Sequence, residues 1–157
     1  VFYCNPNNPV ATYVGARATR EFIARVHRIS PETTILVDEA YFDYVADPDH
    51  ETMMPLAIED PRIVVARTFS KAYGMAGLRL GYAVGHPDAI RRMNAWDSAS
   101  GTSSLNVLAL HAGTAQAQLP TPHPASRDTL RDDRTFSFYD RGPYRAAVPR
   151  PESVLGY

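Results

Sequence analysis

Short apolar runs separate stretches of helical spacing along the first 118 residues of the chain. The runs at residues 1–3, 34–37 and 63–66 predict buried β-strands, because short continuous apolar segments are typical of strands covered on both faces. The second strand is expected to end at Asp38 and the third to run up to Thr68. A fourth strand is expected over residues 78–84, after a segment punctuated by glycines.

Apolar residues at helical spacing predict three helices. The first covers residues 16–29, and its apolar face is formed by Phe22, Ile23, Val26 and Ile29. The second begins at Pro87, since proline is favoured in a first helical turn, and the third is expected over residues 104–116.

Strands that alternate with helices predict an α/β fold built on a mostly parallel sheet. Ligands of such sheets bind beyond the carboxyl ends of the strands. Asn8, Asp38 and the Ser70-Lys71 pair each follow a predicted strand. We therefore expect these residues to share one site.

The character of the chain changes after residue 118. The last 39 residues contain 6 of the 13 prolines, apolar periodicity fades, and Arg and Asp dominate residues 127–134. Two interpretations stay open: an irregular, flexible tail, or loss of the natural reading frame near this point. We divide the chain into a domain at residues 1–118 and an irregular or divergent tail at 119–157. Because Val1 lies within a predicted strand, the natural N-terminus is expected to be missing.

Composition excludes several classes of function. A net charge of −1 gives no reason to expect a nucleic acid or an anionic membrane as partner, and no apolar run reaches the roughly 20 residues that span a bilayer. The single cysteine, Cys4, fits a reducing compartment, so a cytoplasmic protein is expected. The five histidines lack the spacing of metal ligands, and no metal is expected.

One basic residue stands apart from the others. Of the 16 basic residues, 15 are Arg and the only Lys is Lys71. Arg can replace Lys as a surface charge, but it cannot serve as an amine nucleophile because guanidinium stays protonated. Lys71 is therefore a candidate nucleophile, with chance retention on the surface as the alternative.

Three segments in order carry a family resemblance. They are Tyr3-Cys4-Asn5-Pro6-Asn7-Asn8-Pro9, Val37-Asp38-Glu39-Ala40-Tyr41, and the run from Thr68 to Tyr82 that contains Ser70-Lys71 and Arg79. Together they resemble the class I and II aminotransferases of the pyridoxal 5′-phosphate (PLP) fold type I, and most nearly the histidinol-phosphate aminotransferase branch. The resemblance covers about residues 1–118, and it implies that this domain is part of the family's large PLP-binding domain.

The resemblance implies a role for each candidate residue around the cofactor ring. Lys71 would bond the PLP aldehyde as an imine and move the proton during catalysis. Asp38 would pair with the pyridine nitrogen and keep it protonated. Asn8 and Tyr41 would donate hydrogen bonds to the phenolate oxygen of the ring.

The phosphate of the cofactor would be held by a second group, comprising Thr68, Ser70 and Arg79. Arg79 lies eight residues beyond Lys71, as in the family pattern. The chain departs from the family after Pro9, where the usual Thr-Gly is replaced by Val10-Ala11, and this change makes the local turn geometry less certain.

Each of these residues also has a structural interpretation. Asp38 suits a helix cap or turn, Tyr41 suits core packing, and Asn8 suits a turn. Ser70 suits a helix cap, and Arg79 suits a surface ion pair. Glu39 is expected to be structural or solvated, whatever the function of the chain.

A complete relative would exchange an amino group between an amino acid, such as histidinol phosphate or an aromatic amino acid, and a 2-oxo acid. Two other hypotheses remain: another fold type I reaction, such as decarboxylation of an amino-acid phosphate or carbon–sulfur lysis, and a non-catalytic fragment. The resemblance also implies a homodimer for the full-length parent. The regions that would supply a ring-stacking aromatic and a substrate-carboxylate arginine have no counterpart in this sequence.

Overall fold

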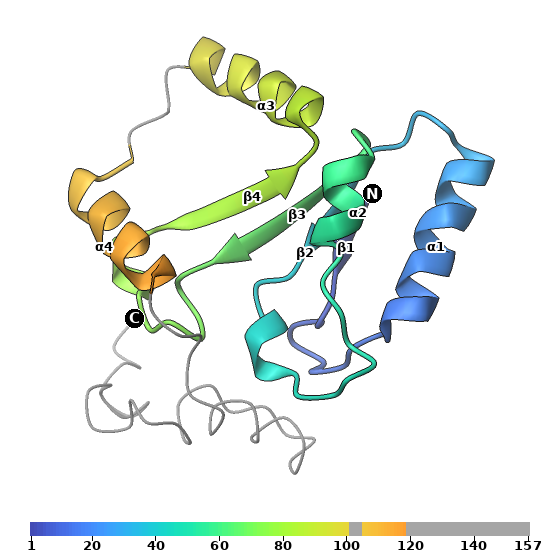
Figure 1. Cartoon of the computed structure of the whole chain (residues 1–157), viewed down its shortest axis with the longest axis horizontal. Coiled ribbons are helices and arrows are strands. Elements are labelled where there is room, and N and C mark those ends of the chain that lie inside the picture. Colours follow the sequence, from blue (N-terminus) through green and yellow to red (C-terminus); the bar gives the residue numbers. More distant parts are fainter. Residues whose placement is uncertain (101–104, 119–157) are drawn as a thin grey trace.

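The computed structural model describes residues 1–100 and 105–118, which form four strands and flanking helices (Figure 1). The strands are β1 (Phe2–Cys4), β2 (Ile35–Asp38), β3 (Ile63–Thr68) and β4 (Gly81–Gly85). The α-helices are α1 (Ala16–Ile29), α2 (Met54–Glu59), α3 (Pro87–Ser100) and α4 (Val107–Ala117). Two 3₁₀ turns are η1 (Phe42–Tyr44) and η2 (Ala76–Leu78). None of the helices in this part of the chain combines the length and the apolar character that crossing a bilayer requires.

The sheet has the order β1-β2-β3-β4 and confirms the predicted α/β, mostly parallel class. β1, β2 and β3 pair in parallel, with Asp38 opposite both Cys4 and Ala66. β4 runs antiparallel to β3 and places Gly81 opposite Thr68. The carboxyl ends of β1, β2 and β3 and the start of β4 therefore lie at the same end of the sheet, which we call its carboxyl edge.

The main core lies between one face of the sheet and the helices α1 and α2. Successive residues of a strand point to opposite faces, so alternate residues of β2 and β3 form this surface. The residues that meet there are Ile35, Val37, Ile63 and Val65 from the strands, and Ala16, Ile23, Met53 and Ala57 from the helices or their ends. Burying an aliphatic side chain of this size contributes about 1.5–3 kcal/mol, so this layer is the main apolar support of the sheet.

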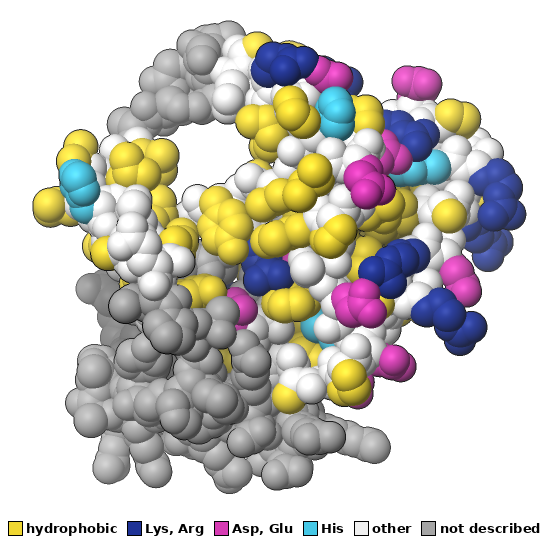
Figure 2. Space-filling model, viewed as in Figure 1, with side chains coloured by type: hydrophobic (Ala, Val, Ile, Leu, Met, Phe, Trp, Pro, Cys, Tyr) yellow, Lys and Arg dark blue, Asp and Glu magenta, His cyan; other side chains and the backbone are white. Residues whose placement is uncertain are grey.

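The outer side of α1 is basic. Exposed arginines follow the helix at positions 17, 20, 25 and 28, and Figure 2 shows a dark blue surface at the right of the molecule, over α1. Of the predicted apolar face only Ile23 is fully buried, whereas Ile29 is 75% exposed. Phe22 stays at the surface and stacks on Tyr3, with ring centroids 5.0 Å apart.

A second, smaller apolar cluster holds the loop between β3 and β4. Phe69, Leu80 and Ala109 are buried together, so α4 packs against the segment that contains Lys71. The packing depends on Gly113, because a Cβ at this position would lie 2.2 Å from Leu80 Cδ2.

The structure corrects three sequence predictions. The strand expected over residues 78–84 begins at Gly81, because residues 76–78 form η2 and Arg79 adopts the left-handed region at φ 53°. The helix expected from residue 104 begins at Val107, where Asn106 caps it by accepting a hydrogen bond from the amide of Leu108 at 2.8 Å. β1 is an outermost strand of the sheet and Phe2 is 68% exposed, so β1 is not the buried strand that was expected. The expected irregular tail lies outside the described residues.

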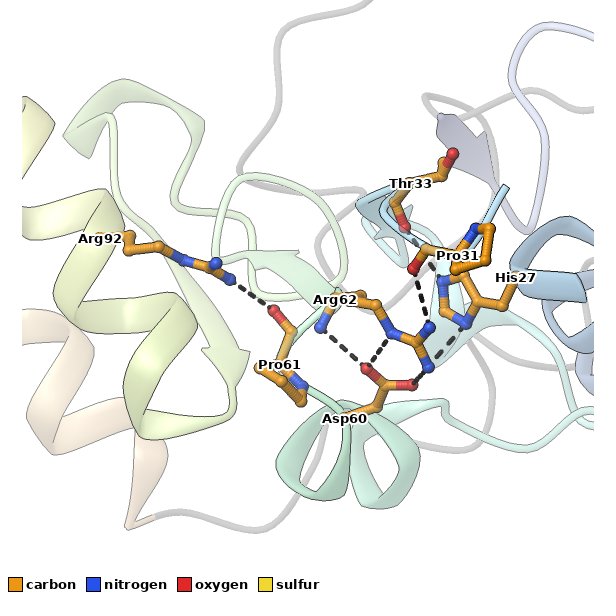
Figure 3. A network of polar contacts seen from close by, with 7 residues as sticks. All are labelled: His27, Pro31, Thr33, Asp60, Pro61, Arg62 and Arg92. Atoms are coloured by element: carbon orange, nitrogen blue, oxygen red, sulfur yellow. Dashed lines mark hydrogen bonds and ion pairs between the residues drawn. The ribbon is translucent and has the colours of Figure 1, made fainter. Parts of the chain in front are cut away.

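A polar network joins the elements at the opposite edge of the sheet (Figure 3). Asp60 accepts hydrogen bonds from Arg62 Nε at 2.9 Å and from Arg62 Nη2 at 2.7 Å. Arg62 also donates to the carbonyl of Pro31, and His27 Nδ1 lies 3.7 Å from Asp60 Oδ2. The network ties the end of α1 and the start of β2 to the start of β3.

Asp60 makes this network sensitive to acid. The hydrogen bonds from the Arg62 side chain lower the pKa of Asp60 from 3.8 to about 2. A lowered pKa in the folded state means that the ionised carboxylate favours folding above about pH 4, and that this contribution is lost as the pH falls through about 2.

We predict that Asp60→Asn lowers the thermal midpoint at pH 7 by a few degrees, about 2–4 °C for each kcal/mol lost in a chain of 157 residues. The difference from the unsubstituted chain should narrow as the pH falls below about 2, where both carry a neutral side chain. Circular dichroism melts at both pH values measure it, with the exposed neighbour Glu59→Gln as control. A difference that is equal at both pH values would contradict the role of the charge.

Candidate functional site

The loop that follows β1 is held by a buried asparagine. Asn5 donates from Nδ2 to the carbonyl of Val14 at 2.9 Å, and its Oδ1 accepts from the amide of Val14 at 2.8 Å. These two bonds join Asn5 to Val14 and so close the loop that contains Asn8. The sequence analysis assigned no role to Asn5, although its place within the Asn-Pro-rich segment was the available signal.

Asn8 and Tyr41, predicted to act on the same atom of a cofactor, lie in direct contact. Asn8 Nδ2 donates a hydrogen bond to Tyr41 Oη at 2.7 Å, although 33 residues separate the two in sequence. The Tyr41 residue is only 6% exposed, so its predicted core packing and its polar contact coexist. The two side chains present a phenol and an amide together at the carboxyl edge of the sheet.

Lys71 lies beside this pair. Its Nζ is 5.2 Å from the centre of the Tyr41 ring, while the residue as a whole is exposed. Lys71 follows β3, Tyr41 follows β2 and Asn8 follows β1, so three neighbouring parallel strands deliver one amine, one phenol and one amide to the same place.

Asp38 is the last residue of β2 and forms the turn that was its structural alternative. Its Oδ1 accepts a hydrogen bond from the amide of Ala40 at 3.0 Å. Within the described part of the chain its second oxygen, Oδ2, accepts no hydrogen bond. Asp38 therefore shapes the turn toward Tyr41 with Oδ1.

The residues predicted to bind the cofactor phosphate are only partly brought together. Thr68 Oγ1 accepts from the amide of Ser70 at 3.0 Å and donates to the carbonyl of Leu80 at 3.3 Å, so it closes the base of the Lys71 loop. Arg79 is exposed and donates to the carbonyl of Ala76 at 3.0 Å; the described residues offer it no ion pair of the kind expected at the surface. Its position just before Gly81, opposite Thr68, nevertheless places its backbone at the same edge.

Behind these residues lies a buried ion pair. Glu39, expected to be structural or solvated, is 2% exposed and lies 2.8 Å from Arg67 Nη2. Arg67 is a residue of β3 that the sequence analysis did not single out, because one arginine among fifteen carries no distinguishing signal. The structural interpretation of Glu39 is the one observed.

The electrostatics exclude one neighbour as a proton carrier near neutral pH. Burial, with smaller contributions from Tyr41 and Asp43, raises the pKa of Tyr44 to about 12. Tyr44 therefore keeps its proton beside Tyr41, whose ring centre lies 6.3 Å away. Among residues 1–100 and 105–118, no three His, Cys, Asp or Glu side chains gather in a way that could hold a metal ion.

Comparison with known proteins identifies the family of the chain. The family model for aminotransferases of class I and II matches residues 1–137. The chain belongs to the class I and II aminotransferase family. The family uses PLP as its cofactor.

Two curated relatives and one solved structure give the range of similarity. The chain is 49% identical over 94 residues to histidinol-phosphate aminotransferase 2 of Bacillus cereus, covering 60% of this chain and 25% of the relative. It is 51% identical over 90 residues to the aromatic amino acid aminotransferase of Mycobacteroides abscessus, covering 57% and 25%. The histidinol-phosphate aminotransferase of Sinorhizobium meliloti, solved with pyridoxal 5′-phosphate, is 33% identical with a TM-score of 0.53, covering 60% of this chain and 25% of that one. The matched part thus spans about a quarter of these aminotransferases.

The departure from the aminotransferase pattern at residues 10 and 11 has a structural consequence. Ala11 adopts φ 54°, the left-handed region that favours glycine, and its amide donates to the carbonyl of Asn7 at 3.0 Å. The turn beside Asn8 therefore keeps a backbone conformation suited to glycine although the side chain has changed. For a residue with a Cβ this conformation costs roughly 1–2 kcal/mol.

We predict that Ala11→Gly stabilises the chain by about 1 kcal/mol, part of the gain being offset by the greater freedom of glycine in the unfolded chain. Chemical denaturation measures the change. The matched control is Ala18→Gly at an exposed position of α1, where the same substitution should destabilise by about 1 kcal/mol. Equal destabilisation at both positions would contradict strain at Ala11.

Proposed function

We propose that residues 1–118 form part of the PLP-binding core of an aminotransferase, in which Lys71 bonds the cofactor. The contact that carries the proposal is the hydrogen bond from Asn8 to Tyr41 beside the amine of Lys71. Family membership and the PLP complex of the Sinorhizobium meliloti relative support it. A cytoplasmic location and a homodimer of the full-length parent belong to the same proposal.

The donor set of the site fits the polar edges of PLP. A phenolate oxygen needs donors, which Tyr41 and Asn8 offer; an aldehyde needs an amine, which Lys71 offers; and a pyridinium nitrogen needs an anion, which Asp38 offers. Thr68 and Ser70, with Arg79 on the approach to β4, supply hydroxyl and guanidinium groups for a phosphate.

PLP, when bound, serves as an electron sink for a carbon that loses a proton. The part assigned to this chain is to hold and move protons around that sink. Lys71 offers the only side-chain amine, so it would take the proton from the substrate carbon and return it at the C4′ carbon of the cofactor. Asp38 would stay ionised beside the ring nitrogen, and Tyr41 with Asn8 would orient the ring.

The substrate proposal is an amino acid of the histidinol-phosphate or aromatic type with a 2-oxo acid as acceptor, after the two curated relatives. Decarboxylation of an amino-acid phosphate and carbon–sulfur lysis use the same cofactor residues, so product analysis of the full-length parent separates them: a 2-oxo acid for amino transfer, carbon dioxide or a thiol for the others. A non-catalytic fragment would give none of these products.

Lys71→Ala should abolish covalent capture of the cofactor, because no other side-chain amine exists. The chain is mixed with PLP and reduced with borohydride, and the pyridoxyl group is mapped by peptide mass spectrometry. The unsubstituted chain is expected to carry it on Lys71. Lys71→Arg, which keeps the charge but not the nucleophile, is the matched control and should also lack the adduct. An unchanged adduct yield in either variant would overturn the assignment.

Asp38→Asn in the full-length parent is predicted to leave PLP bound but to slow turnover by about a hundredfold or more, because a neutral amide does not hold a proton on the ring nitrogen. The substitution preserves the turn, since an asparagine Oδ1 can still accept from the amide of Ala40. Steady-state kinetics and bound-cofactor absorbance measure the two effects separately. Turnover equal to that of the unsubstituted enzyme would exclude this role.

A further inference from the structure

The buried carboxylate of Glu39 is fully engaged away from the candidate site. Oε1 accepts from the amide of Met53 at 2.7 Å, and Oε2 accepts from Thr52 Oγ1 at 2.8 Å and from Arg67 Nε at 2.9 Å. Its partner Met53 belongs to the core beneath the sheet, so the Glu39 side chain extends toward the face that α1 and α2 cover. Glu39 is therefore a structural anchor placed directly between two candidate cofactor residues, Asp38 and Tyr41.

Arg67 binds the far end of the same turn as well. Its Nη1 lies 3.7 Å from Asp43 Oδ1, and its guanidinium carbon lies 3.9 Å from the centre of the Phe42 ring. The Arg67 side chain is 10% exposed, and that of Asp43 is equally enclosed. One guanidinium thus holds residues on both sides of Tyr41, with two ion pairs and a cation–π contact in a partly desolvated place where such contacts are strong.

The contacts of Arg67 join two segments that are distant in the sequence. Arg67 lies in β3, next to Thr68 and four residues before Lys71, whereas Glu39 and Asp43 flank Tyr41 after β2. The amide of Glu39 also donates to the carbonyl of Ala66 at 2.9 Å. The side-chain contacts of Arg67 add to this backbone bond and further link the Tyr41 turn to the strand that leads to Lys71.

We propose that Arg67 is a positioning residue, whose contacts with Glu39 and Asp43 hold Tyr41, and through it Asn8, at a fixed place relative to Lys71. This inference rests on the function proposed for that site. By strand alternation the Arg67 side chain lies on the same face of the sheet as Val65, and its proposed action on the site is through the turn at residues 39–43. A guanidinium suits this task because it stays charged and contacts Glu39 Oε2 through both Nε and Nη2.

The first test needs no cofactor. Hydrogen–deuterium exchange of the full 157-residue chain is compared between the unsubstituted chain, Arg67→Met and Arg62→Met. Arg62 is the matched control, because it also binds a carboxylate but lies at the opposite end of β3. Arg67→Met is expected to speed exchange at residues 38–45 by about tenfold and to leave exchange in α1 unchanged. The effect stays local because the turn can open without unfolding the rest of the chain. Arg67→Lys, which keeps a cation but not the two-pronged grip, gives the same comparison in a less disruptive variant.

The second test uses the chain loaded with PLP. Donors on the phenolate oxygen lower the pKa of the lysine–cofactor linkage, so a displaced Tyr41 should raise the pH midpoint of the visible absorbance change by about one unit. Arg62→Met should leave this midpoint where it is, even if it lowers the thermal midpoint as much as Arg67→Met does. A purely structural role of Arg67 would not move the midpoint.

The outcomes separate the two proposals. Faster exchange confined to residues 38–45 in Arg67→Met, together with a raised pH midpoint, supports positioning. Exchange that rises equally across the sheet, or equally in Arg62→Met, overturns it, as does an unchanged pH midpoint in a chain that binds PLP. If the unsubstituted chain binds no PLP, the proposed function fails for this chain, and the exchange experiment alone decides whether Arg67 holds the Tyr41 turn.

Discussion

Parallel pairing of β1, β2 and β3 is the constraint on which the candidate site depends. It sends three carboxyl ends to one edge of the sheet, and antiparallel β4 returns to that edge at Gly81. Each following loop then needs only a few residues to reach its neighbours. The contact between Asn8 and Tyr41 across 33 residues is a direct consequence. The apolar layer beneath the sheet fixes the strands, so the site inherits its geometry from the core.

The polar groups at this edge fall into two sets. Asn5, Glu39 and Arg67 pair with backbone groups and with other side chains, and each lies largely buried. Burying such groups is tolerated because they are paired. The bonds of Asn5 close the loop that carries Asn8, and Arg67 contacts residues on both sides of Tyr41. The site thus has a supporting layer, which a pattern of motifs does not show.

The sequence predicted the fold most accurately where apolar periodicity is strong. The helix at residues 16–29 and the strands ending at Asp38 and Thr68 lie where they were expected. The α2 helix was not predicted, because six residues beginning Met-Pro carry little helical periodicity. β4 was started too early, because the apolar Leu78 and Leu80 resemble strand residues, although Leu80 packs into the cluster under α4. Exposure was also misjudged: Ile29 has the spacing of a core residue, yet nothing in the described chain covers it.

The candidate site was predictable to a different degree from its support. Asn8, Tyr41 and Lys71 stand in ordered motifs, so their meeting could be expected, whereas Arg67 is indistinguishable in sequence from fourteen other arginines. Structure assigns the cations of β3 by position: Arg62 binds Asp60 at the amino end, and Arg67 binds Glu39 near the carboxyl end. A guanidinium that never loses its proton suits both anchors. The side-chain amine, which unlike a guanidinium can act as a nucleophile, is that of Lys71 in the loop between β3 and β4. The chemical difference between Arg and Lys, rather than their shared charge, therefore separates the paired guanidinium groups of Arg62 and Arg67 from Lys71, the proposed nucleophile.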